Sequence, residues 1–307
     1  MMPARLGEKP LSSGSGGATS QSHSSPLPTA VDELWKRRAA LGPGDPEARS
    51  VVVSAVDMLD SGRARVAAVS GDGEVVVDER ALKAVTLAFH VLGMARCQVG
   101  DFHHNDRIPL KTSLDGVRVV PGAIARWGAH LAPGVVLMPS FVDIGAHVGA
   151  GTTVGTWASV GSCAQVGDDV RLSCGTVVGG GGGAVGGLGG LEGLEGDGAA
   201  PAIVEDGALV GSRAVVGEGA RVGRGAVLGA GTILSARTPV VDARTGEELG
   251  RGRVPDRCVA AGGTRSTRFE GGDFGLPCVL VVGRLREGPR HDRAELDEIL
   301  REHGLEA

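Results

Sequence analysis

Large aromatic side chains are nearly absent from this sequence. Its 307 residues include five Phe, three Trp and no Tyr, so aromatic residues make up 3% of the chain. A core built on stacked rings is therefore excluded, and the interior must be packed from Val, Leu, Ala and Gly. Gly is correspondingly abundant, with 53 residues against an average usage of about 7%. The length allows one large domain or two modest ones.

Three further absences restrict the partners and the compartment. The net charge is −5 and there is no basic stripe, so nucleic acids and anionic membranes are poor partners. No apolar run is long enough to cross a membrane. The N-terminus also lacks the apolar segment of a signal peptide. We therefore predict a cytoplasmic protein.

Cysteine is scarce and scattered. The five cysteines form no CxxC pair, and their number is odd. In a chain without an export signal, this predicts reduced thiols, mostly buried and structural, rather than a disulfide framework, a metal site or a catalytic thiol. The five are Cys97, Cys163, Cys174, Cys258 and Cys278.

The N-terminal part of the chain divides into two segments. Residues 1–28 are rich in Ser, Gly and Pro, and we predict that they are disordered. Residues 29–115 read as a small α+β domain. Thr29 and Asp45 are expected to cap two helices. A Gly-Asp-Gly turn at 71–73 predicts a hairpin, and the stretch DERALKAVTLAFHVLG after it reads as a third helix.

Residues 116–238 carry a repeat of six residues. Neither an α-helix nor simple strand alternation has this period, whereas a parallel β-helix does. A β-sandwich of short strands would not keep one period for so long. We predict that each hexad forms one strand and one corner, that three hexads close a coil, and that the repeats make four to five coils. The expected inward-facing residues are Val136, Val142, Val148, Val154, Val160, Val166, Leu172 and Val178, followed by Val204, Val210, Val216, Val222, Leu228 and Leu234.

Small residues and glycines punctuate this repeat. Four residues after each inward position the side chain is usually Ala, Ser or Thr, which suits a tight corner. Five glycines are expected at bends that need unusual dihedral angles. They are Gly145, Gly161, Gly167, Gly211 and Gly223.

Two segments depart from the repeat. The Gly-rich residues 179–202 predict a loop that leaves the solenoid, either as a flexible lid over a neighbouring site or as an inert linker. Residues 239–307 predict a C-terminal cap. We expect a hairpin that turns at Thr245-Gly246, a buried strand at LPCVLVVGRL, and a terminal helix with Leu296, Ile299 and Leu300 on its apolar face.

Several short sequence motifs, within the repeat and on either side of it, indicate a family. Residues 118–167, which begin RVVPGAIARWGAHL and end VGTWASVGSCAQVG, resemble the tetrahydrodipicolinate N-succinyltransferase family. So do DRIPLK at 106–111, VEDGALVGSRAVV at 204–216, DARTGEELGRGRVP at 242–255 and LPCVLVV at 276–282. The resemblance implies a left-handed parallel β-helix, a homotrimer with sites between neighbouring subunits, and a place in lysine biosynthesis. It also implies that a succinyl group is transferred from succinyl-CoA to the amine of the ring-opened substrate, which is 2-amino-6-oxopimelate.

The resemblance also assigns site positions. Arg118 matches the family arginine that binds a substrate carboxylate, for which a guanidinium fork is well suited. Gly155 stands where the family has an Asp beside the acceptor amine, and Val215 stands where it has the proposed catalytic Glu. An amine that attacks a thioester must lose a proton. The two replacements therefore suggest a changed acceptor, a changed proton path or no catalysis, with Asp143 and Glu218 as weak substitutes for the acids.

Other candidates are less specific. Arg265 and Arg268 are candidates for binding the CoA phosphates. A base acting across a trimer seam could be His130 or His147, whereas the adjacent His103 and His104 point apart and do not predict a metal site. Two functions remain open: a CoA-dependent N-acyltransferase acting on an amino dicarboxylate, and a catalytically silent trimeric solenoid that binds a ligand or partner.

Overall fold

The computed structural model describes residues 25–179, 200–288 and 293–305. Most of the segment predicted to be disordered, and most of the Gly-rich loop, lie outside these residues. The N-terminal part packs three helices, α1 (Ala30–Lys36), α2 (Pro46–Asp60) and α3 (Glu79–Val91), beside two hairpins. The hairpins are β1 (Ala67–Val69) with β2 (Val75–Val77), and β3 (Ala95–Val99) with β4 (Phe102–Asp106).

The helix caps were partly predictable. Asp45 accepts a hydrogen bond of 2.9 Å from the backbone N–H of Ala48, as a capping carboxylate should. Asp78 caps α3 in the same way. Thr29 stands at the N-cap of α1, as predicted, but its side chain makes no capping hydrogen bond.

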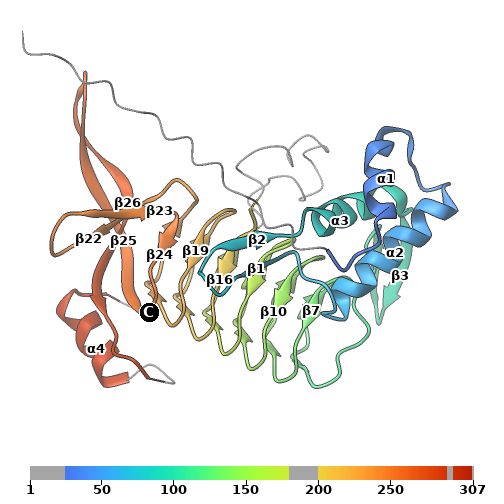
Figure 1. The fold of residues 1–307 in the computed structure, drawn as a ribbon. Helices are drawn as coiled ribbons and strands as arrows, with labels where there is room; N and C mark the ends of the chain where they lie inside the picture. Colours follow the sequence, from blue (N-terminus) through green and yellow to red (C-terminus); the bar gives the residue numbers. More distant parts are fainter. Residues whose placement is uncertain (1–24, 180–199, 289–292, 306–307) are drawn as a thin grey trace, which may run out of the picture.

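The centre of the chain is built from two-residue strands that visit three parallel sheets in turn (Figure 1). Each strand pairs with the strands three before and three after it, as β11 does with β8 and β14. We call residues 118–234 the solenoid. Its strands are β5 (Arg118–Val119), β6 (Ile124–Ala125), β7 (His130–Leu131), β8 (Val136–Leu137), β9 (Phe141–Val142), β10 (His147–Val148), β11 (Thr153–Val154), β12 (Ser159–Val160), β13 (Gln165–Val166), β14 (Arg171–Leu172), β15 (Val177–Val178), β16 (Ile203–Val204), β17 (Leu209–Val210), β18 (Val215–Val216), β19 (Arg221–Val222), β20 (Val227–Leu228) and β21 (Ile233–Leu234).

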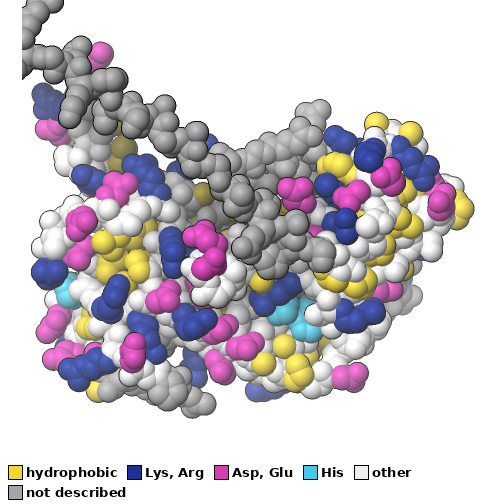
Figure 2. All heavy atoms as spheres, in the orientation of Figure 1, with side chains coloured by type: hydrophobic (Ala, Val, Ile, Leu, Met, Phe, Trp, Pro, Cys, Tyr) yellow, Lys and Arg dark blue, Asp and Glu magenta, His cyan; other side chains and the backbone are white. Residues whose placement is uncertain are grey.

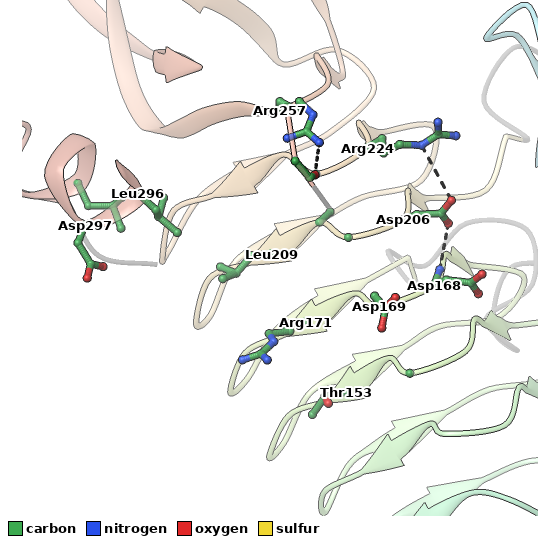
Figure 3. A pocket seen from close by; sticks show the side chains of 16 residues that line it. Thr153, Asp168, Asp169, Arg171, Asp206, Leu209, Arg224, Arg257, Leu296 and Asp297 are labelled. Carbon is green, nitrogen blue, oxygen red and sulfur yellow. Dashed lines mark hydrogen bonds and ion pairs between the residues drawn. The ribbon is translucent and has the colours of Figure 1, made fainter. Parts of the chain in front are cut away.

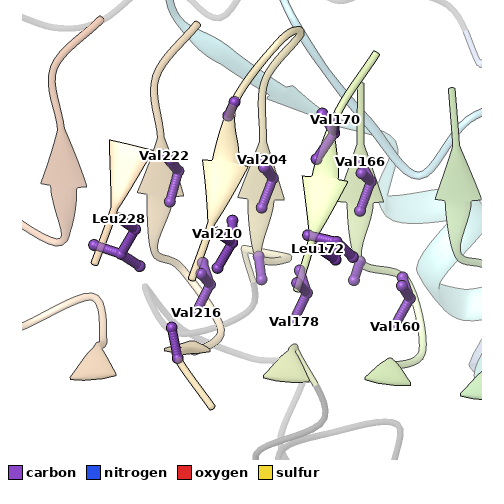
Figure 4. Packing of buried hydrophobic residues seen from close by; sticks show 14 of the residues in the cluster. Val160, Val166, Val170, Leu172, Val178, Val204, Val210, Val216, Val222 and Leu228 are labelled. Carbon is purple, nitrogen blue, oxygen red and sulfur yellow. The ribbon is translucent and has the colours of Figure 1, made fainter. Parts of the chain in front are cut away.

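The second residue of most strands faces the interior. From Val142 to Leu234, every predicted inward residue is at most 2% exposed, and these side chains stack into one core (Figure 4). The prediction for Val136 was wrong. Leu137 is the fully buried residue, and the step from it to Val142 is five residues because that corner has three residues instead of four. The first strands of the solenoid are β5 and β6, within the predicted bounds of 116–238 but ahead of the first predicted inward residue.

The predicted role of the glycines was wrong for four of five. A positive φ falls on the third residue after most inward positions, which includes Gly145 but also Trp157 and Cys163. Gly161, Gly167, Gly211 and Gly223 directly follow an inward residue and have no positive φ. At three of these four positions a glycine is required because the next coil of the solenoid comes too close for a side chain. A Cβ atom on Gly167, Gly211 or Gly223 would lie between 2.2 and 2.5 Å from an atom of the next coil.

The three sheets differ in their outward-facing residues, and we name them accordingly. The histidine sheet presents His130, His147, Gln165, Ile203, Arg221 and Arg253. The arginine sheet presents Arg118, Val136, Thr153, Arg171, Leu209, Val227 and Val259. The valine sheet presents Ile124, Phe141, Ser159, Val177, Val215 and Ile233.

The C-terminal cap extends the solenoid and covers part of it. β22 (Pro239–Asp242) and β23 (Glu248–Arg251) form the predicted hairpin, with Gly246 at φ 73° in its turn. β24 (Arg253–Val254) and the start of β25 (Cys258–Phe269) add strands to the histidine and arginine sheets. α4 (Arg293–Glu302) has the predicted apolar face of Leu296, Ile299 and Leu300, and this face packs over the end of the arginine sheet.

One cap strand differs from its prediction. β26 (Gly272–Arg284) is buried at Cys278 and Val279, but its first half is exposed. Together with β25 it forms a long two-stranded ribbon that projects sideways from the end of the solenoid (Figure 1). Among the described residues, no helix has the length and hydrophobicity needed to span a membrane.

Candidate active site

Arg118 and Gly155 lie on the same side of the solenoid. Arg118 is exposed on β5 and pairs with Val136, which pairs in turn with Thr153 on β11. Gly155 follows β11 directly. At roughly 4.8 Å per strand, the backbones of β5 and β11 are about 10 Å apart. The residue implied to bind a carboxylate thus lies two strands from the position where the resemblance implies an acid.

Val215 lies around the corner from Gly155. It is half-buried on the valine sheet and pairs with Val177, which pairs with Ser159, the start of the strand after Gly155. Gly155 and Val215 therefore flank one corner of the prism, two coils apart. We call the turn residues between the arginine and valine sheets the site corner: 138–140, 155–158, 173–176, 211–214 and 229–232.

The site corner contains no acidic residue. Its functional side chains are instead hydroxyls, a thiol, an arginine and an exposed indole. Trp157 is 79% exposed and has φ 60°, and Arg213 is exposed with φ 59°. Left-handed backbone is unfavourable for such residues, but it recurs at this turn position in most coils and does not by itself mark a functional site. Cys174 is exposed on the same corner and Cys97 is exposed on β3, whereas the other three cysteines are buried, as expected for most of the five.

Asp143 and Glu218 lie on a different corner, between the valine and histidine sheets. Asp143 already has partners: it accepts hydrogen bonds from Arg126 at 3.0 Å, from the Ser162 hydroxyl at 2.9 Å and from the backbone N–H of Ile144 at 2.8 Å. Both carboxylates contribute to a raised pKa of the fully buried Cys163 thiol, whose main cause is burial. Neither acid faces the site corner, so we do not propose either as a substitute base.

His130 and His147 belong to the contact between the N-terminal domain and the solenoid. Their rings stack with centroids 4.6 Å apart, and His130 lies directly beneath Gly62. The pKa of His147 is lowered to about 3, mainly by burial and then by the nearby Arg65 and His130. Its Nδ1 atom is buried without a hydrogen-bond partner in the described structure. Both histidines therefore contact the N-terminal domain of their own chain, and their role as bases at a subunit seam stays a prediction.

Arg265 and Arg268 lie on the exposed ribbon and are both paired. Arg265 contacts Glu248 at 3.1 Å, and Arg268 contacts Asp273 at 3.0 Å. To bind a phosphate of CoA, each arginine would have to give up the carboxylate that it contacts in this structure. His103 and His104 lie on β4, where consecutive side chains point to opposite faces. Within the described ranges, no cluster of His, Cys, Asp or Glu could hold a metal ion.

A groove of about 870 Å³ separates α4 from the arginine sheet (Figure 3). Part of its wall is formed by three outward-facing residues of the arginine sheet, Thr153, Arg171 and Leu209, and Leu296 of α4 faces them. Arg171 is exposed and has no ion pair in the described part of the chain. Arg257 is engaged, since it donates to the backbone oxygens of Arg286 and Gly288 at 2.5 Å. Sequence reasoning missed Arg171, although it precedes the inward Leu172 as Thr153 precedes Val154.

Comparisons with known proteins place these features in a family. A family model described as "Tetrahydrodipicolinate N-succinyltransferase N-terminal" matches residues 26–91, and "Hexapeptide repeat of succinyl-transferase" matches residues 201–236. The 2,3,4,5-tetrahydropyridine-2,6-dicarboxylate N-succinyltransferase of Thioalkalivibrio sulfidiphilus is 40% identical over 91% of this chain and 99% of its own length. The chain belongs to the tetrahydrodipicolinate N-succinyltransferase family.

Other members of this N-succinyltransferase family give the same picture. The enzymes of the same name from Paramagnetospirillum magneticum and Granulibacter bethesdensis are 41% and 38% identical, each over 90% of this chain and 98% of its own length. The resemblance inferred from sequence words is thereby confirmed. Because the similarity runs through both terminal parts, the N-terminal domain and the cap belong to the N-succinyltransferase architecture together with the repeat.

On its surface, this N-succinyltransferase family member mixes charges of both signs. Lys and Arg alternate with Asp and Glu over the visible face, without a patch of one sign (Figure 2). Such a surface gives no electrostatic support for a polyanionic macromolecule as partner.

Proposed function

We propose that this protein transfers the succinyl group of succinyl-CoA to the amino group of ring-opened tetrahydrodipicolinate. The observation that carries the proposal is the near-full-length identity of about 40% to enzymes named for this reaction. The comparisons give no support to a changed acceptor or to a silent solenoid, both of which the sequence had left open.

The proposed architecture is a left-handed parallel β-helix that assembles as a homotrimer. The regular visit to three parallel sheets supports the helix. The exposure of the valine sheet supports the trimer. Five of its six outward residues are apolar, and its end members Ile124 and Ile233 are 38% and 63% exposed. The histidine sheet has the N-terminal domain and the arginine sheet has α4, so the valine sheet is the face that most needs a neighbouring copy.

The proposed site is the site corner, completed by the neighbouring subunit. Arg118 holds an acceptor carboxylate through two parallel hydrogen bonds. The neutral amine attacks the thioester carbonyl, and CoA leaves as the thiolate. Because the site corner has no carboxylate, the proton of the attacking amine passes to water, or to the departing thiolate, instead of to a side chain at position 155 or 215.

Acceptor-dependent release of thiol from succinyl-CoA tests this proposal. We expect release with tetrahydrodipicolinate, and much less with acetyl-CoA as donor or without acceptor. L-2-Aminopimelate serves as an open-chain acceptor that needs no ring opening. If calorimetry shows CoA binding while no acceptor releases thiol, the proposed reaction is wrong and the protein is a binding protein.

A further inference from the structure

The ribbon of β25 and β26 has one apolar face and one polar face. Residues directly opposite each other in an antiparallel pair share a face, and the register pairs Thr267 with Phe274 and Arg265 with Leu276. One face therefore carries Phe269, Phe274 and Leu276. The other face carries Thr264, Ser266, Pro277 and the ion pair of Arg268 with Asp273.

The apolar face is open to solvent in the single chain. Phe269, Phe274 and Leu276 are 47%, 54% and 44% exposed. The two rings meet edge to face, with centroids 6.0 Å apart, at the tip of the ribbon. Closer to the solenoid the same face is covered, since Cys278 is 3% exposed. Among the described residues the covered surface therefore ends where the ribbon leaves the body of the chain.

The direction and length of the ribbon place this face beyond its own coils. The ribbon runs across the solenoid axis and not along it (Figure 1). Its free part, from Gly262 to Phe269, spans roughly 24 Å at 3.4 Å per residue. One side of a coil is a single hexad, which covers at most about 20 Å even when fully extended. A ribbon of this length and direction reaches a body lying beside the solenoid.

We propose that the apolar face of the ribbon packs against a second copy of this chain, as an arm that clasps the neighbouring subunit. The inference rests on the homotrimer of the proposed function. Two observations favour a second copy as the occupant. The chain has its own exposed apolar surface in the valine sheet and Trp157, which can meet such a face, and an isolated two-stranded ribbon is only marginally stable in water. The charged residue on the apolar face, Arg265, is already paired with Glu248 and adds no unpaired charge to the contact.

The first test is the oligomeric state of the full chain by light scattering over a range of concentrations. The double variant Phe274→Ser with Leu276→Ser should raise the dissociation constant of the assembly by roughly tenfold or more, since buried aromatic anchors contribute at this level. The matched control is Thr264→Ala with Ser266→Ala, on the polar face of the same strands, which should leave the assembly unchanged. Equal dissociation constants for the two variants would overturn the inference.

The second test does not depend on a substitution that weakens the ribbon. Photoreactive benzoylphenylalanine is placed at Phe274, and in a separate protein at Ser266. Irradiation should give products of twice the chain mass from position 274 and far fewer from position 266. Reaction within single chains only, in a sample shown to be trimeric, would overturn the arm while leaving the trimer intact. A monomeric wild-type chain would overturn both, whereas thiol release from succinyl-CoA reports on the reaction independently.

Discussion

A Cβ atom on Gly155 would lie 2.5 Å from the carbonyl oxygen of Leu172 in the next coil. The same oxygen accepts a hydrogen bond of 2.8 Å from the Gly155 N–H. The backbone of the next coil therefore occupies the space that a side chain at position 155, including the acid implied by the resemblance, would need.

Restoring the acid should consequently harm the protein. We expect Gly155→Asp to lower the free energy of unfolding by about 1–3 kcal/mol, the usual range for overpacking, and to lower activity. Urea unfolding and thiol release measure the two effects. Gly217→Asp is the matched control, because Gly217 also follows an inward valine but its added Cβ would have 3.5 Å of clearance. A Gly155→Asp variant that is as stable as the wild type and more active would show that the acid position is still functional.

The pH dependence of the reaction should report the substrate and not a protein base. With no carboxylate on the site corner, log(kcat/KM) should rise with unit slope through neutral pH toward the pKa of the acceptor α-amine, which an adjacent carboxylate holds above that of a peptide N-terminus. An inflection between pH 4 and 7 would reveal a titrating protein group. His147 cannot supply that inflection, because its pKa is lowered to about 3.

Arg118 should act on acceptor binding without acting on stability. Its side chain is exposed and has no ion pair in the described structure. Loss of a charge-assisted pair costs about 1.5–3 kcal/mol, so Arg118→Ala should raise KM for the acceptor by roughly 10–100-fold. Arg118→Lys should recover only part of this, because an ammonium lacks the bidentate fork. The exposed Arg244→Ala is the control, and an unchanged KM in Arg118→Ala would remove the residue from the site.

His147 should make the protein sensitive to acid. Its pKa lies below the unfolded value near 6.5, so the unfolded chain binds the proton first and stability is lost as the pH falls from about 6.5 toward 3. At the lower end the loss amounts to a few kcal/mol. The variant His147→Leu should match or slightly exceed wild-type stability at pH 7, because the unpaired Nδ1 is removed. It should also lose less stability between pH 7 and 4.5 in urea unfolding; parallel curves for the two proteins would contradict the assignment.

A buried ion pair within the solenoid, whose arginine also contacts the N-terminal domain, predicts a strong non-additive effect. Arg221 contacts Glu205 at 2.6 Å and donates to the backbone oxygen of Gly73 in the N-terminal hairpin at 2.5 Å. The change Arg221→Met leaves Glu205 buried without its partner and should cost about 3–5 kcal/mol. The double variant with Glu205→Met should recover most of that loss. Additive losses in the double variant would mean that the pair does not act as a unit.

The repeat could be predicted because the interior of the solenoid accepts one apolar residue per hexad wherever that hexad lies. One corner departs from this period. Val136 and Leu137 are both apolar, and a rigid period of six selects the first, whereas the shortened corner at Met138, Pro139 and Ser140 turns the second inward. The short sequence motifs identified the family independently of the six-residue period, because they depend on specific residues and not on spacing.

The surroundings of the site could not be predicted in the same way. A period tells which residues point outward, but not which outward face another domain covers. His130 and His147 therefore looked available, although the N-terminal domain lies over them. Arg171 was overlooked because its groove is completed by α4, more than a hundred residues later in the chain.

The corners of the solenoid have a consequence for how such chains vary. One corner is a residue short, another is interrupted between Val178 and Ile203, and a third contains the β22–β23 hairpin, yet Val166 still pairs with Val204 and Val222 with Val254. Strand pairing between coils, and not distance along the chain, sets the alignment. Insertions and deletions can therefore accumulate at corners while the number of coils stays constant, so members of this family can differ in length and still superpose strand for strand.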